Sequence, residues 1–459
     1  MKRSIYFITS VGAGLCVFLL PLNLLPEAKL ALCGMAAAIV LWISRPFPEY
    51  VTALLLSVYL IAVCQVPMNL VFGAFSKPTL WLLLCAFGLS LGISRCGLLD
   101  RMAQGLLRFC DKSYTGRVLG LAVTVLVCSP FIPSMSAKAA VFAPLCQGVS
   151  ALSGYPDKSR PAAGLFLAML TTLRSTGPLF ISASVNGYAL RSLMPETYAA
   201  EMTLVRWFIA ALPWFLLVTF MSLSMILLLF HPKREKRSVE PCQKKALPPM
   251  TIQQRGMALI MTGTLLLWIT EPLHGLAAHI VAILALCLTI GCNILPSRQF
   301  ITEMNWHAII FIGLVLELSA VFSYLGISEV LMQTLTPALA QFNGHPLLFI
   351  LLTALVTILM RLIIVSEIAL INLFMVILLP LTMALGLHPW VACISVYAVV
   401  CTWFFSYQSP VYLAACYASD DNVLTPRKAF FSCAVYMIFC ILALAACIPY
   451  WKSIGLLYL

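Results

Sequence analysis

Residues 118–149 read VLGLAVTVLVCSPFIPSMSAKAAVFAPLCQGV, an apolar stretch interrupted by Pro130 and Pro133. Two full crossings of a hydrocarbon core about 30 Å thick need about 40 residues, so this stretch either crosses once or enters and returns. The loop before it is rich in Lys and Arg, and the loop after it contains Lys158 and Arg160. Because positively charged loops stay on the cytoplasmic side, both ends are cytoplasmic. The stretch is therefore predicted to be a re-entrant hairpin.

A second apolar region, residues 346–385, has the opposite surroundings. Its flanks, residues 326–345 and 386–389, contain neither Lys nor Arg. The absence of positive charge favours the outer side of the membrane. We therefore predict that this second hairpin enters from outside.

The rest of the chain is also typical of a membrane protein. Apolar residues make up 62% of the sequence and charged residues only 10%, whereas soluble domains carry about 25% charged residues. The blocks that are long enough to cross a bilayer are 5–22, 28–44, 50–66, 79–95, 161–190, 206–230, 256–271, 274–293, 306–325, 389–416 and 428–448. They predict an all-α polytopic membrane protein with about 11 transmembrane helices and two re-entrant hairpins. The N-terminus is expected in the cytoplasm and the C-terminus in the periplasm, and the first span is expected to be a helix rather than a signal peptide.

Charge and cysteine usage exclude several other classes. The net charge is +12, but the basic residues concentrate in loops beside the spans, above all in 231–255. Such a distribution orients a membrane protein, so we expect a lipid bilayer and no nucleic acid as partner. The 17 cysteines show no C-x-x-C pair, and in apolar spans Cys acts as a small hydrophobic residue. No HExxH, GxSxG or paired-carboxylate motif is present, so we expect no enzyme and no metal site.

Three landmarks recur along the chain in the same order. The run LWISRP at 41–46 returns as LWITEP at 267–272, Trp81 returns as Trp306, and Ser134 returns as Ser366. Five predicted crossings separate the two copies of the first run, so the second copy has the opposite orientation. Inverted repeats with broken helices are a signature of secondary transporters.

The repeat divides the chain into three parts. The first inverted repeat is 1–230, with scaffold helices in 1–117, a hairpin and a broken helix in 118–190, and a helix at 206–230. A basic cytoplasmic linker follows at 231–255. The second repeat is 256–459, with scaffold helices in 256–345, a hairpin and a broken helix in 346–416, and a last helix at 428–448.

Polar or helix-breaking residues interrupt the apolar helices in four places, which are the hairpin tips at 130–138 and 361–367 and the breaks at 174–186 and 406–410. Unpaired backbone at membrane depth is tolerated only where protein or a watery cavity surrounds it. Helix N-termini that face such a cavity attract a carboxylate. The candidate substrate-binding residues in these places are Ser134, Ser136, Ser184, Asn186, Ser366, Glu367, Tyr407, Gln408 and Ser409. Helix packing and local hydrogen bonding are the alternative roles for such residues.

Three ionisable residues near these interruptions are candidates for charge compensation or coupling. Lys138 could neutralise the anion or stand in for a bound cation, and Glu367 could bind a coupling proton. Arg174 is a candidate of the same kind, and structural pairing is the alternative for all three. Glu317 lies far from every predicted tip, so we expect it to form a structural ion pair.

With these segments identified, the chain resembles the divalent anion/sodium symporter family over nearly its whole length, and especially the citrate/succinate antiporter branch. The stretch LWISRPFPE at 41–49 resembles the family's aromatic-Ile-Thr-Glu-x-x-Pro segment, and FISASVN at 180–186 and VRWFIAALP at 205–213 resemble stretches of that branch. The family carries a Ser-Asn-Thr triplet at each hairpin tip. Here the triplets read Ser134-Met135-Ser136 and Ser366-Glu367-Ile368, so the first Ser is kept and Asn is lost in both.

The resemblance implies a homodimer that works as an elevator, with a small anion carried by the two hairpins and the two broken helices. It also implies that Met135 belongs to the binding site and that Lys138 occupies a place where the antiporter branch often has a basic residue. We therefore expect a secondary transporter in a bacterial inner membrane that exchanges di- or tricarboxylates such as succinate, malate and citrate. The alternatives are symport with Na⁺ or H⁺, an inorganic anion or sulfonate as cargo, and a sensor that binds without transport. We expect no resident cofactor.

Overall fold

The computed structural model describes residues 2–19, 24–44, 46–107, 113–232, 249–327, 330, 345–364, 366–403, 409–419 and 424–457. The chain is 82% helical, and the described part contains no strand. The predicted all-α membrane fold is confirmed. Tyr407 and Gln408 lie outside the described residues.

The first half runs from two N-terminal helices to a long helix that precedes the linker. Its elements are α1 (Lys2–Phe18), α2 (Pro26–Ser44), α3 (Glu49–Ala62), α4 (Met68–Val71), η1 (Gly73–Ser76), α5 (Pro78–Arg95), α6 (Leu98–Leu107), α7 (Tyr114–Cys128), η2 (Ser129–Phe131), α8 (Met135–Leu152), α9 (Arg160–Leu179), η3 (Ile181–Ala183), α10 (Val185–Leu193), α11 (Glu196–Glu201) and α12 (Leu204–Phe230).

The second half has a similar order of helices. Its elements are α13 (Ile252–Ile269), α14 (Glu271–His274), α15 (Ala278–Gly291), α16 (Ser297–Glu303), α17 (Trp306–Val315), α18 (Leu318–Tyr324), α20 (Pro346–Ile363), α21 (Glu367–Ala384), α22 (Pro389–Val400), α23 (Pro410–Ala418), α24 (Pro426–Ala446) and α25 (Ile448–Ser453). Each half thus places a hairpin (α7–α8, α20–α21) before a broken helix (α9–α10, α22–α23) and a long helix (α12, α24).

The two halves also share local hydrogen bonds at corresponding places. Trp42 Nε1 donates to Glu49 O at 3.2 Å, across the turn between α2 and α3. Trp268 Nε1 donates to Ala278 O at 3.0 Å, across the turn between α13 and α15. A buried indole N–H needs a hydrogen-bond acceptor. In each half, the Trp of the LWI run therefore connects one scaffold helix to the start of the next through a hydrogen bond to a backbone carbonyl.

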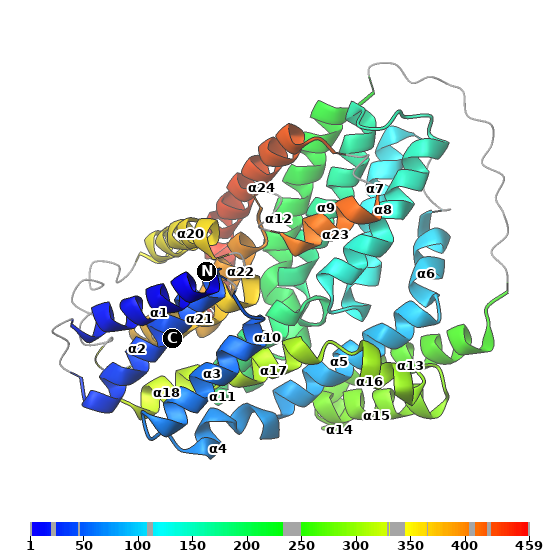
Figure 1. The fold of residues 1–459 in the computed structure, drawn as a ribbon. Helices are drawn as coiled ribbons and strands as arrows, with labels where there is room; N and C mark the ends of the chain where they lie inside the picture. The colour runs from blue at the N-terminus through cyan, green and yellow to red at the C-terminus, as the bar shows by residue number, and fades with distance from the viewer. Residues whose placement is uncertain are drawn as a thin grey trace.

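The elements form two layers (Figure 1). Scaffold helices α2–α5 and α13–α18 form the lower band of the view, and most of the hairpins and broken helices form the upper block together with α12 and α24, with α10 and α21 next to the band. In the block, α9 packs against α7, α8 and α12, and α22 packs against α20 and α21. Every residue of α22 is buried, as are nearly all residues of α9. Each broken helix is therefore the buried axis around which the arms of its hairpin pack.

Five helical segments among the described residues have at least 18 residues and are apolar enough to cross a membrane, namely Tyr114–Phe131, Leu204–Phe230, Trp306–Tyr324, Glu367–Ala384 and Arg427–Ser453. Shorter apolar helices of 10–17 residues accompany them. The predicted number of crossings, about 11 by length and apolarity, stays a prediction.

Three predicted boundaries differ from the structure. The first break begins after Leu179 rather than at Arg174, because Pro178 lies in the last turn of α9 without ending it. The first hairpin tip ends at Ser134, so Lys138 lies inside α8. The predicted span 306–325 is two helices, α17 and α18, with Glu317 at their junction.

Glu317 lies where those two helices meet. Its carboxylate is buried and lies 2.9 Å from Lys77 Nζ, which precedes α5. The expected structural ion pair is therefore present, and it joins the two scaffold halves.

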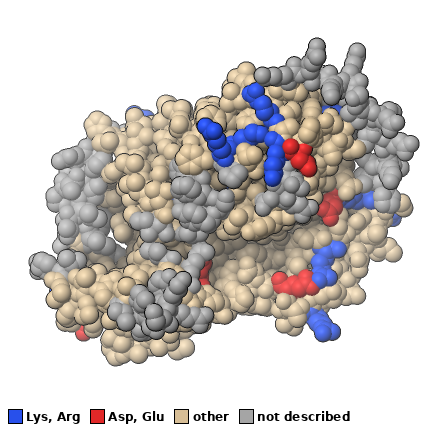
Figure 2. Space-filling model, turned by 45° about the horizontal axis from the view of Figure 1, so that its top comes forward, with Lys and Arg blue, Asp and Glu red and all other residues tan. Residues whose placement is uncertain are grey.

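Figure 2 shows one face of the molecule, most of which is neither acidic nor basic. Basic side chains gather on the upper part of this face and near its lower right edge, and the surface is hollowed between the upper and lower parts.

Candidate functional site

The two hairpin tips end at serine N-caps. Ser134 Oγ accepts a hydrogen bond from Ala137 N at 3.3 Å at the start of α8. Ser366 Oγ accepts one from Ala369 N at 3.3 Å at the start of α21. A serine at this position satisfies one of the free N–H groups of a helix start. Both tips thus offer a helix N-terminus with a hydroxyl, an arrangement that favours anions.

The two helix breaks resume in the same way. Ser184 Oγ accepts a hydrogen bond from Asn186 N at 3.2 Å and begins α10. Ser409 Oγ accepts one from Tyr412 N at 3.1 Å and begins α23. The two hairpin tips and the two helix breaks thus provide four serine-capped helix starts.

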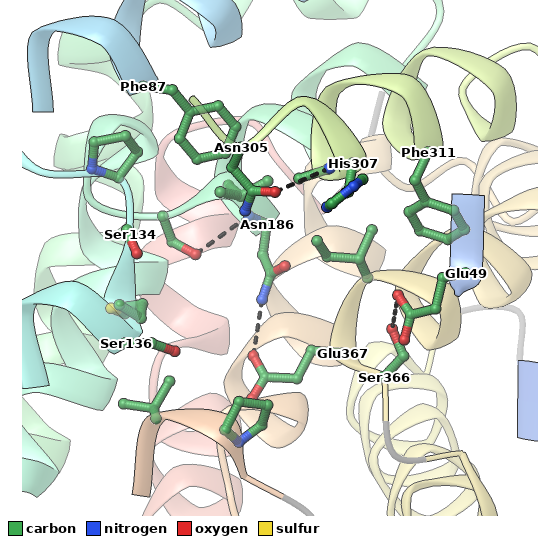
Figure 3. Close-up of a pocket in the computed structure, with 18 of the residues that line it drawn as sticks. Glu49, Phe87, Ser134, Ser136, Asn186, Asn305, His307, Phe311, Ser366 and Glu367 are labelled. Atoms are coloured by element: carbon green, nitrogen blue, oxygen red, sulfur yellow. Dashed lines mark hydrogen bonds between the residues drawn. The ribbon is translucent and has the colours of Figure 1, made fainter. Parts of the chain in front are cut away.

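A cavity of about 560 Å³ lies where the hairpin tips and breaks meet the scaffold (Figure 3). Its lining includes Ser134, Met135, Ser136, Ser184, Asn186, Ser366 and Glu367 from the predicted site, Pro133, Val185, Ile368, Pro410 and Val411 beside them, and Pro48, Glu49, Tyr50, Phe87, Asn305, His307, Ala308 and Phe311 from the scaffold. Residues from both halves of the chain thus line one chamber.

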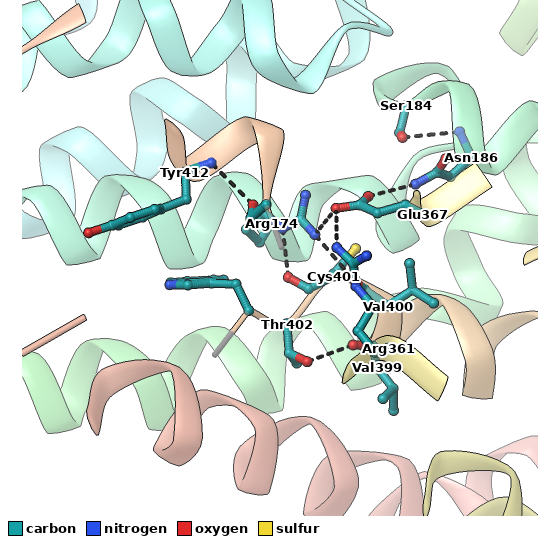
Figure 4. Close-up of polar contacts among 12 residues, drawn as sticks. Arg174, Ser184, Asn186, Arg361, Glu367, Val399, Val400, Cys401, Thr402 and Tyr412 are labelled. Atoms are coloured by element: carbon teal, nitrogen blue, oxygen red, sulfur yellow. Dashed lines mark hydrogen bonds and ion pairs between the residues drawn. The ribbon is translucent and has the colours of Figure 1, made fainter. Parts of the chain in front are cut away.

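Glu367 lies at the centre of a polar cluster at the second tip (Figure 4). Its Oε1 is 2.6 Å from Arg174 Nη2 and 3.4 Å from Arg361 Nη2. Its Oε2 accepts a hydrogen bond from Asn186 Nδ2 at 3.0 Å. Both guanidinium groups are fully buried. The residue that replaces the triplet Asn therefore joins α9, α10, α20 and α21 through charge-assisted bonds.

The two arginines also bond backbone carbonyls left free at the second break and tip. Arg174 Nε donates to Cys401 O at 2.6 Å, and its Nη2 lies 3.3 Å from Val400 O. Arg361 Nη1 donates to Ile364 O at 3.2 Å. Fixed cations thus occupy positions beside the carbonyls at which α20 and α22 end.

Lys138 has the corresponding role at the first tip. Its Nζ donates to Ala183 O at 2.7 Å and to Ser129 O at 3.3 Å, and the side chain is fully buried. One carbonyl belongs to the hairpin and the other to the break, so the ammonium joins the two. Val185 N also donates to Pro133 O at 3.2 Å across the same junction.

Most of the predicted candidates come together, but not all of them face the cavity. Ser409 is fully buried and outside the lining, although the next residue, Pro410, lines it. Lys138 and Arg174 lie behind the tips rather than in the lining. The described residues contain no group of three or more His, Cys, Asp or Glu side chains that could hold a metal.

The scaffold residues of the lining were missed by the sequence reasoning. Glu49 lies at the start of α3, and its Oε2 accepts a hydrogen bond from Ser366 Oγ at 3.2 Å. The rings of Tyr50 and His307 stack with centroids 4.8 Å apart. Asn305 caps α17 by accepting from Ala308 N at 3.2 Å. Glu49 ends the LWISRPFPE stretch that resembles a family segment, but a polar residue at the start of a scaffold helix is common at membrane surfaces and gives no indication of a place in the cavity.

Comparison with known proteins gives consistent matches. The family model described as the sodium:sulfate symporter transmembrane region matches residues 1–457. The chain is 26% identical over 345 residues to the chloroplastic dicarboxylate transporter 2 of Spinacia oleracea, an alignment covering 71% of this chain and 60% of that protein. It is 26% identical over 327 residues to the inner membrane protein YbhI of Escherichia coli (strain K12), covering 67% of this chain and 68% of that protein.

A solved structure gives a likeness in fold. The crystal structure of the YdaH transporter of Alcanivorax borkumensis superposes with a TM-score of 0.60 at 17% identity, covering 84% of this chain and 88% of that one. The chain spans 47–60% of the length of the first curated relatives that it matches.

Proposed function

The chain belongs to the sodium:sulfate symporter transmembrane region family and is a multi-pass membrane transporter, and from this premise we propose that it exchanges di- and tricarboxylates across a bacterial inner membrane. Its substrate class is a small anion. The narrower choice of carboxylates is supported by the spinach relative, whose name is that of a dicarboxylate transporter.

The observation that carries this proposal is the convergence of both hairpin tips on one cavity of about 560 Å³. Helix N-termini stabilise negative charge, and hydroxyl and amide groups donate hydrogen bonds to carboxylate oxygens. In the proposed complex, Ser134 and Ser136 would bind one carboxylate, and Ser366 and Asn186 would bind the other. Two separate donor sets suit a substrate with two anionic groups.

Fixed charge supports exchange rather than ion-coupled symport. Transporters of this architecture hold coupling ions with unwound backbone carbonyls beside the substrate site. Here the carbonyls of Ser129 and Ala183 accept hydrogen bonds from Lys138, and those of Val400 and Cys401 accept from Arg174. In the proposal these groups replace the coupling ion and remain with the carrier, so binding and transport of the anion need no external cation.

The proposed movement is an elevator in a homodimer. The block of hairpins and broken helices would slide against the scaffold helices, which would also hold the dimer together. The position of the cavity supports this movement, because its lining includes residues of the scaffold, which would stay in place, and residues of the hairpins and broken helices, which would move.

A second candidate keeps the fold and changes the cargo to an inorganic anion or sulfonate. The description of the family names sulfate, and a tetrahedral oxyanion also suits hydroxyls at helix N-termini.

The test is uptake of labelled succinate into proteoliposomes loaded with unlabelled succinate. Competition by external malate and citrate, without competition by sulfate or a sulfonate, is the expected result. No uptake of labelled succinate, together with uptake of labelled sulfate into vesicles loaded with sulfate, would establish the second candidate. Specific binding of succinate without uptake, in vesicles that contain folded protein, would identify a sensor and overturn both.

A further inference from the structure

Glu49 is a scaffold residue that reaches a hairpin tip. It is the first residue of α3, and its Oε2 accepts a hydrogen bond from Ser366 Oγ at 3.2 Å (Figure 3). Both residues line the cavity. A carboxylate of the protein therefore already lies at the second tip, among the groups that suit an anion.

The position that Glu49 takes is one that a substrate carboxylate would need. Ser366 Oγ accepts from Ala369 N and donates its single hydrogen to Glu49. A hydroxyl has one hydrogen to donate, so Ser366 cannot donate fully to Glu49 and to a bound anion at the same time. The free N–H groups at the N-terminus of α21 stabilise a limited amount of negative charge, so they cannot fully stabilise Glu49 and a substrate carboxylate together. Glu49 and a substrate carboxylate therefore compete for the position beside Ser366.

The bond between Glu49 and Ser366 also crosses the boundary between the two layers of the fold. α3 packs against the scaffold helices α2 and α17, whereas α21 packs mainly against α10 and α22 of the hairpin block and touches the scaffold only at α18 among the described helix pairs with several contacts. While the bond is formed, it connects the second hairpin to the scaffold.

We propose that Glu49 is an internal ligand, which occupies the carboxylate position at the second hairpin tip when the carrier is empty and holds the hairpin to the scaffold until a substrate anion displaces it. The inference rests on the proposed function and specifies how exchange is enforced. A substrate carboxylate frees the hairpin by taking over Ser366, whereas the empty carrier remains connected to the scaffold and does not reorient.

The competition has a measurable effect on affinity. A binding-competent state that is only partly populated raises the apparent dissociation constant in proportion. Charge-assisted hydrogen bonds are about twice as strong as neutral ones, so Glu49→Gln, which keeps the shape but removes the charge, shifts the competition toward substrate. We expect the apparent Km for succinate to fall about fivefold to tenfold.

The second effect is on net transport. In vesicles that contain no dicarboxylate, with the membrane potential clamped by K⁺ and valinomycin, wild-type protein should take up little labelled succinate. Glu49→Gln should take up at least severalfold more, because its empty carrier is free to return. Glu27→Gln is the matched control, since Glu27 is an exposed first-turn carboxylate of α2 that does not line the cavity. Glu27→Gln should behave as the wild type does.

The possible outcomes separate this inference from the proposed function. If wild-type protein shows no exchange in loaded vesicles, the proposed function fails. If wild-type protein exchanges and Glu49→Gln has the same Km and the same dependence on internal succinate, the internal-ligand inference alone is overturned. Glu49→Ala repeats the test, and the succinate-induced shift in melting temperature measures binding if either variant transports poorly.

A different role for Glu49 is pairing with an ammonium group of an amino dicarboxylate. In that case Glu49→Gln would lose aspartate or glutamate transport and leave the succinate Km unchanged. That result would overturn the inference, whereas a lower Km for succinate and net uptake into empty vesicles would support it.

Discussion

Lys138→Thr is the substitution that tests the fixed-cation hypothesis most specifically. The ammonium of Lys138 is fully buried and donates to Ala183 O at 2.7 Å and to Ser129 O at 3.3 Å. A hydrogen bond from a charged group contributes about 1.5–3 kcal/mol, and a buried acceptor left unpaired costs about 1–3 kcal/mol. If the shorter bond counts fully and the longer one weakly, Lys138→Thr should remove about 2–3 kcal/mol of stabilising free energy at the junction of hairpin and break.

That loss should appear both in stability and in transport. The melting temperature of purified protein should fall, and kcat/KM for succinate exchange should fall about 30- to 160-fold if the junction must be intact for binding. Lys428→Thr is the matched control, because Lys428 Nζ also donates to a backbone carbonyl, Lys158 O at 2.7 Å, but at an exposed place. It should change neither quantity appreciably.

The same substitution should create a cation dependence. The carbonyls that lose the ammonium, together with the new hydroxyl, provide oxygen ligands for a small cation. We expect Na⁺ to restore part of the activity of Lys138→Thr, with choline as the inactive comparison. Wild-type stability and kinetics in Lys138→Thr, with or without Na⁺, would refute the reasoning.

Three further predictions concern other contacts of the structure. Ser134→Ala and Ser366→Ala each remove an N-cap, worth about 0.5–2 kcal/mol of stability, and a proposed hydrogen-bond donor to the substrate. The double variant should bind succinate more than tenfold more weakly, as measured by the shift in melting temperature that succinate causes. Unchanged binding would exclude both serines from the site. Glu367→Gln leaves two buried guanidinium groups without their carboxylate, so the melting temperature should fall by an amount corresponding to about 3–5 kcal/mol, and an unaltered melting temperature would show that the cluster contributes no net stability. His388, in the turn between α21 and α22, is buried 3.6 Å from Glu201, and burial lowers its pKa despite that carboxylate. As the pH falls, the unfolded chain therefore takes up the proton first, so the stability of the protein should drop below about pH 6.5. An equally large drop in His388→Gln would show that other groups cause the pH dependence.

The architecture could be predicted from the sequence because its signals are local. Pro130 and Pro133 interrupt an apolar stretch, and the charge of the flanking loops restricts how such a stretch can lie in a membrane. The tip serines could be selected as candidates for a similar reason, since Ser134 and Ser366 each directly precede an apolar helical run. The first break was predicted too early because Pro178 reads as a helix end. In the structure Pro178 lies in the final turn of α9, which continues one residue further to Leu179.

The partners of the site residues could not be predicted in this way. Arg174 and Glu367 are 193 residues apart, and no single-sequence pattern indicates which of several ionisable residues pair in the fold. Arg361 lay in the predicted tip, yet its sequence position gave no indication of a role beside Glu367. Glu49 and His307 lie at the starts of scaffold helices, where polar residues are frequent for reasons of membrane topology. Their place in the cavity depends on how the two layers pack.

The measurement that tests the central claim most directly is efflux of labelled succinate from preloaded proteoliposomes into Na⁺-free buffer, with and without external succinate and with the membrane potential and pH gradient clamped. Exchange through fixed cations predicts that label leaves rapidly only when external succinate is present, and that added Na⁺ changes neither rate. Efflux that proceeds without external succinate and is accelerated by Na⁺ would contradict the account.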